Sequence, residues 1–331
     1  MTRSRAHGIL SRPTEAARKL LAGMTVLDPA VGSGAFLVGA LEKLTSLHHP
    51  GSGNRHRVRR QILARLHGVD RDAMAVRITE LRLWLAVIAD DPARMPQRVR
   101  PLPNLDCLVR QGDSLLAPGG WMGQLASSAH CHTGPLAGLR RTFLTATGHE
   151  KTAAARELHR EEHGVACRRA AWMESVMHDA LRQSIADARA PDLFGQPARM
   201  TAAGRREFSV FRRRWHSARE IRRQLHEDRA VPWFQYEIQF GDIVTGQGGF
   251  DLVIGNPPWV RAERLPARLR EHLSERYAWW RAAGDRGIRH QPDLSIAFLE
   301  RGLELASPDG IVALLLPAKI TSAGYAERAR Q

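Results

Sequence analysis

The sequence predicts an α/β protein with a doubly wound parallel sheet, and three stretches support this fold class. Residues 25–47 are typical of a strand, a glycine turn and a helix, the opening unit of such a sheet. Residues 67–89 are typical of a strand that ends in an acid and is followed by a helix. Residues 291–316 are typical of a helix that turns through Ser-Pro-Asp-Gly into an apolar strand.

A helix over residues 11–23 is expected to precede the first strand, Thr25–Asp28. The strand runs into a glycine-rich turn, and residues 37–47 are predicted to be helical. Glycines let a ligand approach the backbone, and a helix N-terminus favours a negative group. The turn has the sequence Asp28-Pro29-Ala30-Val31-Gly32-Ser33-Gly34-Ala35-Phe36.

The second strand, residues 67–70, ends in Asp70. An acid in this place can accept hydrogen bonds from both hydroxyls of a ribose. The alternative role of Asp70 is to cap the helix over residues 73–89, although Asp72 is better placed as the N-cap. This helix is apolar on most sides, so we expect it to be buried with Trp84 in the core.

The middle of the chain is expected to be largely irregular around a third strand. Residues 48–60, 91–106 and 117–150 read as surface loops, and residues 62–66 as a short helix. The third strand, residues 107–110, is followed by Asp113, which in itself is typical of a turn before a helix.

Residues 151–230 are predicted to form a helical hairpin inserted into the sheet protein. Its turn lies at residues 191–197, which begin and end with proline. Two apolar stripes at helical spacing would pack the helices together. The stripes are Ala170, Met173, Met177, Leu181 and Ile185, and then Phe208, Phe211, Trp215, Ala218, Ile221 and Leu225. The outer face of the second helix is basic and either follows a phosphate backbone or is a solvated surface. That face holds Arg212, Arg213, Arg214, Arg219, Arg222 and Arg223.

The stretch around which the chain is organised is Leu252–Ile254 followed by Asn256-Pro257-Pro258-Trp259. The apolar run suits a buried strand, and two prolines must end it. The break leaves an amide and carbonyl groups that can accept hydrogen bonds from an amine, and an indole that can stack on a ring. The alternative is an ordinary Pro-Pro turn with an exposed tryptophan.

Composition places the protein among soluble globular chains. It has 331 residues and a net charge of +15, which fits a polyanionic partner. The alternative is that the predominance of arginine reflects a GC-rich genome. Cys107, Cys131 and Cys167 are widely spaced and predict a reducing compartment without disulfides. His130-Cys131-His132 lacks a second ligand pair, so we expect no metal. No apolar run is long enough to span a membrane, and a cytoplasmic location is expected.

The glycine turn and the Asn-Pro-Pro-Trp stretch, in this order, resemble the two defining loops of N6-adenine DNA methyltransferases of restriction–modification and phage-defence systems. The resemblance implies a Rossmann-like sheet with an inserted hairpin and the cofactor S-adenosylmethionine. It implies catalytic roles for Asn256, Pro257, Pro258 and Trp259. It implies cofactor binding by Asp28, Pro29, Ala30, Gly32, Ser33, Gly34, Phe36, Asp70 and Asp113, with Asp113 at the cofactor's adenine.

The same resemblance implies transfer of a methyl group to a flipped-out adenine of double-stranded DNA, with a separate specificity or endonuclease subunit as a candidate partner. It divides the chain into a cofactor half (1–116), a loop and hairpin (117–230) and a catalytic half (231–331) that ends before the last strands and the target-recognition domain. Ser11-Arg12-Pro13 departs from the family's Tyr-Thr-Pro. The alternatives are a non-catalytic DNA-binding or assembly subunit or fragment, and a methyltransferase of RNA guanine or protein glutamine.

Overall fold

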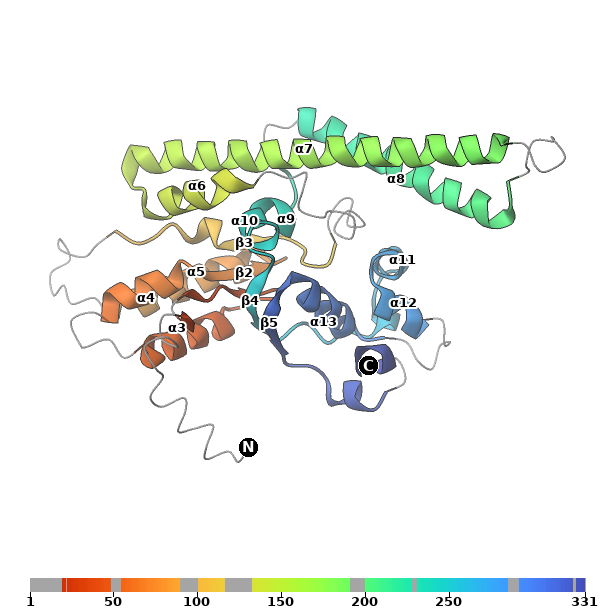
Figure 1. The fold of residues 1–331 in the computed structure, drawn as a ribbon. Helices are drawn as coiled ribbons and strands as arrows, with labels where there is room; N and C mark the ends of the chain where they lie inside the picture. The colour runs from red at the N-terminus through yellow and green to blue at the C-terminus, as the bar shows by residue number, and fades with distance from the viewer. Residues whose placement is uncertain are drawn as a thin grey trace.

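The fold is a five-stranded parallel sheet with helices on both faces and a long helical hairpin along one side (Figure 1). The strand order is β3-β2-β1-β4-β5, and every pair is parallel. The computed structural model describes residues 20–21, 23–48, 55–89, 101–116, 133–190, 200–227, 231–284, 292–323 and 326–330.

The strand order reverses between β1 and β4, which confirms the predicted doubly wound architecture. Ligands of such sheets bind beyond the carboxyl ends of the strands at this point of reversal. The strands are β1 (Val26–Asp28), β2 (Leu66–Asp70), β3 (Val109–Gln111), β4 (Phe250–Gly255) and β5 (Ala306–Leu314).

Two apolar clusters cover opposite faces of the sheet because successive strand residues alternate in direction. Val26 packs with helices α3 (Ala35–Leu47), α4 (Arg55–Leu63) and α5 (Ala73–Ile88). Leu27 packs on the other face, where three further helices contribute aromatic and aliphatic side chains. These are α9 (Tyr236–Gln239), α10 (Gly241–Val244) and α13 (Leu294–Leu305).

Helix α5 is not buried on most sides, contrary to the expectation from its composition. Val76, Leu83 and Val87 face the sheet, whereas a full row of apolar residues points away from it. The sheet offers only one surface, so it can cover only one side of the helix. The exposed row consists of Met74, Ile78, Leu81, Leu85 and Ile88, which are 40% to 64% exposed. Trp84 is half-buried and donates to the carbonyl of Pro103.

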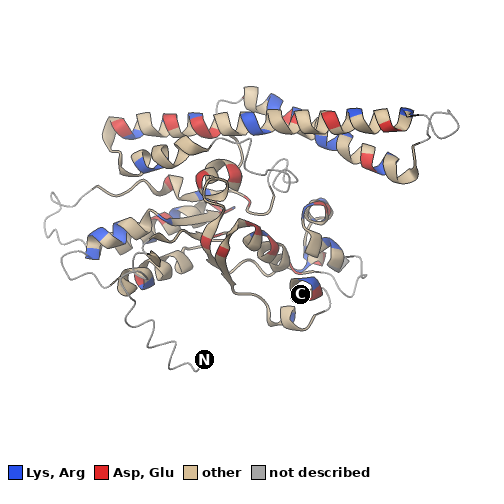
Figure 2. Cartoon of the chain, in the orientation of Figure 1, with Lys and Arg blue, Asp and Glu red and all other residues tan. Residues whose placement is uncertain are grey.

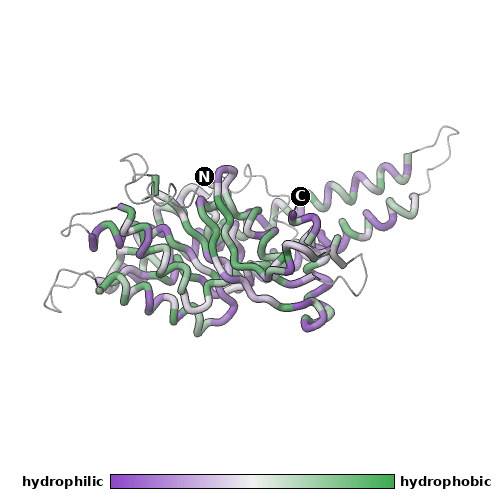
Figure 3. The backbone as a smooth tube through the Cα atoms, turned by 90° about the horizontal axis from the view of Figure 1, so that it is seen from below, coloured by the Kyte–Doolittle hydropathy of each residue, from purple (hydrophilic) through white to green (hydrophobic). Residues whose placement is uncertain are grey.

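The predicted hairpin corresponds to two long helices, α7 (Gly148–Arg189) and α8 (Ala202–Glu227), while its turn lies outside the described residues. Charges of both signs line α7 (Figure 2). Seen from below, the far ends of the two helices stand clear of the rest of the chain (Figure 3). Within the segment predicted as a loop, residues 134–145 instead form α6 (Gly134–Thr145). Proline is tolerated in the first turn of a helix, so Pro135 does not prevent this helix.

Three other boundaries differ from the expectation. The helix α4 starts inside the predicted loop 48–60, and it ends at Leu63, whereas the sequence predicts a helix over residues 62–66. Strand β5 begins at Ala306, before the Ser-Pro-Asp-Gly residues that the sequence predicts as a turn ahead of the strand. A register irregularity between Phe250 and Leu252 of β4 accommodates these residues. Of the predicted helix 11–23, only Leu20, Leu21 and Gly23 are described.

The segment that follows β4 forms short helices before α13. These are the 3-10 turn Ala262–Arg264, α11 (Ala267–Arg276) and α12 (Ala278–Gly284). The remaining elements are the 3-10 turns Leu105–Cys107 and Ala318–Thr321 and α14 (Glu327–Arg330). Among the described residues, no helix combines the length and apolarity that crossing a bilayer requires.

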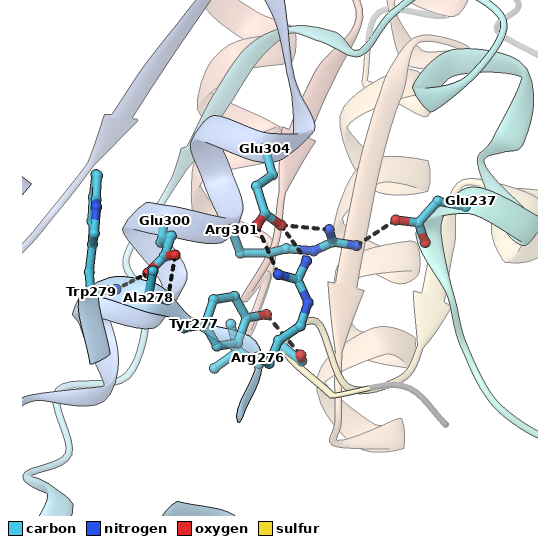
Figure 4. A network of polar contacts seen from close by, with 9 residues as sticks. Glu237, Arg276, Tyr277, Ala278, Trp279, Glu300, Arg301 and Glu304 are labelled. Carbon is cyan, nitrogen blue, oxygen red and sulfur yellow. Dashed lines mark hydrogen bonds and ion pairs between the residues drawn. The ribbon is translucent and has the colours of Figure 1, made fainter. Parts of the chain in front are cut away.

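A chain of ion pairs, buried except at Glu304, ties the helices of one face together (Figure 4). Arg301 of α13 lies 3.2 Å from Glu237 of α9 and 3.0 Å from Glu304, and Arg276 of α11 also bonds to Glu304. Burial alone would raise the pKa of Glu237, but Arg301 and then Arg169 outweigh it and lower that pKa to about 2. The network therefore holds Glu237 ionised at neutral pH.

We expect Glu237→Gln to lower the free energy of unfolding at pH 7 by roughly 3–5 kcal/mol, because it leaves Arg301 without one buried partner. The pKa of Glu237 lies below its usual 4.5 in the folded protein. Its stabilisation is therefore complete above pH 4.5 and is lost as the pH falls towards 2. Urea unfolding should show that the difference between wild type and variant shrinks below pH 4.5. Glu220→Gln, on the exposed face of α8, is the control and should change little. An unaltered stability of Glu237→Gln would contradict the role of the network.

Candidate functional site

At two positions of the glycine turn after β1, the backbone has a conformation that only glycine adopts without strain. Gly32 has φ of 52° and Gly34 has φ of 78°. Gly34 is the N-cap of α3, and its N–H donates to the carbonyl of Val31 over 2.8 Å. A Cβ at Gly34 would lie 2.8 Å from the Thr79 side chain, so space as well as conformation requires glycine.

Helix α5 holds this turn from the side through residues that sequence reasoning missed. The Thr79 hydroxyl donates to the carbonyl of Gly32 over 2.9 Å, and Arg82 donates to the carbonyl of Ser33 over 2.8 Å. No local pattern marks Thr79 or Arg82, since each meets the turn only through the packing of α5 on α3. Both bonds act on backbone carbonyls, so they fix the path of the turn.

Asp70 at the end of β2 binds the same turn. One carboxylate oxygen accepts from the N–H of Gly32 over 2.8 Å and the other from the N–H of Asp72 over 3.0 Å. The cap of α5 is Asp72, whose side chain accepts from the N–H of Met74, as predicted. Asp70 is therefore not the helix cap. Asp70 is half-buried, and its oxygens have further lone pairs that could accept from ribose hydroxyls. Ribose binding by Asp70 stays a prediction.

Asp28 at the end of β1 is the most unusual group of the site. Its side chain is 1% exposed, one oxygen accepts from the N–H of Ala30, and the other is buried without a hydrogen-bond partner. Burial and the negative charge of Asp70 raise the pKa of Asp28 to about 7, against the lowering effect of the Ala30 N–H. A buried oxygen of this kind calls for a donor or a cation.

The catalytic stretch predicted after β4 begins beside Asp28. Strand β4 pairs with β1, and a Cβ at Gly255 would lie 2.5 Å from an Asp28 oxygen, so only glycine leaves room for that carboxylate. Asn256 follows with an exposed side chain. Within the described residues, neither its amide nor the carbonyl of Pro257 has a hydrogen-bond partner. The exposed amide of Asn256 is thus available to a ligand.

Neighbouring segments fix the stretch after Asn256. Trp259 is 55% exposed, and its indole N–H donates to the carbonyl of Leu315 beyond β5 over 3.2 Å. The N–H of Leu294 donates to the carbonyl of Val260 over 2.8 Å, where the chain meets the start of α13. Pro257 is buried and Pro258 is exposed.

A cavity of about 630 Å³ opens at the carboxyl end of β3, next to the predicted ligand residue Asp113. Asp113 accepts from the N–H groups of Leu115 and Leu116, and its other oxygen lies 3.4 Å from Arg71. Asp113 is therefore a turn residue that also faces a cavity, and its contact with a cofactor adenine stays a prediction. The wall opposite includes Trp233, which the sequence did not single out.

The described residues fit S-adenosylmethionine on structural grounds. An unpartnered carboxylate oxygen of Asp28 suits the positive charge of its methionine end, and the open side of Gly32, where a Cβ would meet no atom within 4 Å, leaves room for the ligand. In the ranges that the structure describes, no three His, Cys, Asp or Glu side chains are grouped to hold a metal, and residues 130–132 lie outside those ranges.

This sheet order, with a glycine turn after β1 and a proline-stopped loop after β4, defines a methyltransferase. The chain belongs to the Eco57I restriction-modification methylase family, whose model matches residues 64–331. The model of the MmeI DNA-methyltransferase domain matches residues 7–100. The resemblance inferred from the two motifs is thereby confirmed.

Three curated relatives cover the chain to different extents. A putative type II restriction enzyme and methyltransferase of Methanocaldococcus jannaschii is 27% identical over 88% of this chain, which spans 26% of that relative. The type II methyltransferase M.BstVI of Geobacillus stearothermophilus is 30% identical over 25% of the chain and 13% of its own length. The adenine-specific methyltransferase PglX of Streptomyces coelicolor is 33% identical over 31% of the chain and 8% of its own length. The chain thus spans about a quarter or less of each relative.

We expect Asp28→Asn to stabilise the ligand-free protein at pH 8 and to weaken S-adenosylmethionine binding. The pKa of Asp28 is about 7 in the folded protein and near 3.8 in the unfolded chain. The folded protein therefore loses stability as the pH rises from 4 to 7, where Asp28 ionises more readily in the unfolded chain. The neutral amide avoids a cost of roughly 3–4 kcal/mol above pH 7. Urea unfolding should show that Asp28→Asn has a higher free energy of unfolding than wild type at pH 8, and that this difference shrinks towards pH 4. Calorimetry should show about a tenfold or greater loss of cofactor affinity.

Asp72→Asn is the matched control, because Asn is an equally good N-cap and Asp72 is exposed. It should leave both unfolding and cofactor affinity nearly unchanged. A variant Asp28→Asn that is less stable than wild type at pH 8 would show that the carboxylate has a partner in solution.

Proposed function

We propose that the protein transfers a methyl group from S-adenosylmethionine to the N6 amine of a flipped-out adenine in double-stranded DNA. The observation that supports this most directly is the meeting of two loops at one edge of the sheet. The turn that begins at Asp28 and the loop that begins at Asn256 leave neighbouring parallel strands, and Gly255 brings them within contact of each other. A methyl donor and an acceptor amine held by these loops would be adjacent.

The first loop would hold the cofactor. When bound, S-adenosylmethionine supplies an electrophilic methyl group on sulfur. Asp28 offers a buried carboxylate oxygen to the positive end of the cofactor, and the backbone at Gly32 and Gly34 leaves room for close approach. Asp70 keeps that backbone in place and would accept from the ribose hydroxyls. Positioning of this kind supplies much of the rate enhancement of a direct transfer.

The second loop would hold the amine. The lone pair of adenine N6 is delocalised into the ring, which makes the nitrogen a weak nucleophile. Hydrogen bonds from both amino hydrogens, to the Asn256 side-chain oxygen and to the Pro257 carbonyl, would favour a pyramidal nitrogen and localise that pair. Both oxygens lack hydrogen-bond partners within the described residues, so no internal bond must first be broken.

Trp259 would stabilise the extruded base by stacking. The Leu315 carbonyl holds its indole N–H while more than half of the side chain stays exposed. Because the indole is held at its N–H edge, one face of the ring stays open to a base. Stacking on this face would offset the stacking that the base loses when it leaves the duplex. The name of the relative PglX, an adenine-specific methyltransferase, also supports adenine as the target. A separate specificity or endonuclease subunit belongs to the same proposal.

Asn256→Ala should lower methyl transfer to unmethylated duplex DNA by about 10²–10³-fold or more, the typical loss for one hydrogen-bonding group at a reacting centre. Because Asn256 faces the amine and not the cofactor, S-adenosylmethionine affinity should stay within about twofold. Transfer of labelled methyl groups, with detection of N6-methyladenine by mass spectrometry, measures the first quantity and calorimetry the second.

Trp259→Phe serves as the control, since it keeps a stacking ring and should retain most of the activity, whereas Trp259→Ala should lose roughly 1–3 kcal/mol of base binding. Full activity of Asn256→Ala would rule out the mechanism. Labelling of RNA or protein without labelling of DNA would replace the proposed substrate.

A further inference from the structure

The hairpin ends in an arm that has no contact with the sheet. The buried residues of α7 end at Met177, and those of α8 begin at Ala218. Residues 178–190 and 200–217 therefore contain no buried side chain among those described. We call these two segments the arm; Figures 1 and 3 show it extending away from the remainder of the chain.

Four arginines of the arm are exposed and carry uncompensated charge. Arg205 and Arg206 donate only to main-chain carbonyls of their own helix region, and Arg212 and Arg213 have no ion pair. In the described part of the chain, none of the four has a carboxylate within ion-pair distance. Beyond the arm, the exposed Arg222 pairs with Glu174 and Arg223 with Glu220 and Glu227, while Arg219 lies over the ring of Trp215.

The four arginines share one face of α8. The side that faces α7 is marked by Ala218, which is buried in the core, and by Trp215, whose ring lies 6.5 Å from that of His178. At 100° per residue, Arg205, Arg206, Arg212 and Arg213 all lie away from that side. The first pair and the second pair are seven residues, or about 10 Å, apart along the helix. They form a double row of guanidinium groups, and the only acid of residues 202–217 is Glu207.

The arm lies on the same side of the molecule as the segments that follow Asn256. Arg214 of α8 is within electrostatic reach of Glu275 on α11, the first helix after the catalytic loop. Figure 1 places the outer part of α7 and α8 beyond α11 and α12, at the opposite end from α3, α4 and α6. A duplex whose base enters the site would therefore have the arm beside it and not behind it.

We propose that Arg205, Arg206, Arg212 and Arg213 bind the phosphate backbone of duplex DNA beside the site. This inference rests on the proposed function for its choice of partner. Arginine forks match phosphate geometry, and a duplex presents one phosphate per about 3.4 Å on each strand, so pairs spaced along the helix can contact successive phosphates. The net charge of +15 favours the same partner over a neutral one. Such contacts position DNA without reading its sequence.

The test compares two variants that each remove four positive charges. The arm variant is Arg205→Gln, Arg206→Gln, Arg212→Gln and Arg213→Gln. The control variant is Lys43→Gln, Arg57→Gln, Arg141→Gln and Arg156→Gln, four exposed residues on α3, α4, α6 and the start of α7. Binding of a labelled duplex of about 30 base pairs is measured by fluorescence anisotropy at several NaCl concentrations, and S-adenosylmethionine binding reports correct folding.

Each lost phosphate contact lowers the slope of log K against log salt by about 0.9, so the arm variant should lose about 2–4 units of slope. Its DNA affinity should fall tenfold or more at 0.1 M NaCl, and its KM for DNA should rise while kcat is retained. The control variant should keep its slope within about one unit. The inference is overturned if both variants lose the same salt slope and DNA affinity, or if the arm variant keeps the wild-type slope. The second result would point to an acidic protein as the partner of the arm.

The two proposals fail separately. Wild-type protein that binds DNA through the arm but transfers no methyl group overturns the proposed function alone. Wild-type protein that methylates DNA while the arm variant keeps the wild-type slope and KM overturns the arm alone.

Discussion

The pairing of β1 with β4 is the constraint on which the candidate site depends. These strands are distant in sequence, yet Leu27 lies opposite Val253 and both chains leave the sheet at the same edge. Hydrogen bonding between parallel strands therefore determines where the two loops meet. Gly255 completes the arrangement, because any side chain there would occupy the place of the Asp28 carboxylate. Neither loop alone would bring a donor and an acceptor together.

The same edge concentrates negative charge where the fold can least solvate it. Asp28 is buried with an oxygen lacking a partner, and Asp70 is close enough to raise the pKa of Asp28 further. An ionised carboxylate in this place lowers the stability of the ligand-free protein, because its charge is buried and not fully compensated by donors among the described residues. On the far side of the sheet, Arg301 joins Glu237 and Glu304 in pairs whose charges compensate one another. The acids of that network have charged partners within the protein, whereas one oxygen of Asp28 has no hydrogen-bond partner among the described residues.

The sequence predicted those parts of the structure that local chemistry determines. The positions of glycine and proline predicted the turn at Gly32–Gly34 and the end of the strand at Asn256. The short polar side chain of Asp72 predicted the N-cap of α5. The parts that failed depend on tertiary contacts. Nothing local in α5 shows which side the sheet covers, so its exposed row was not foreseen. Thr79 and Arg82 lie far along the chain from the carbonyls they bind, and α6 was hidden by glycines and Pro135 that its first turns accommodate.

Helix α7 has a further consequence because it is one uninterrupted element of 42 residues. At 1.5 Å per residue it is about 60 Å long, comparable to the length of roughly 18 stacked base pairs. About a third of the way along this helix, the ion pair between Glu162 and Arg110 ties it to the edge strand β3. The length of the insertion, and not the size of the sheet, therefore sets how far the tip of the hairpin lies from the sheet. Deleting two helical turns would draw the tip back by about 11 Å and leave every atom of the reaction centre in place.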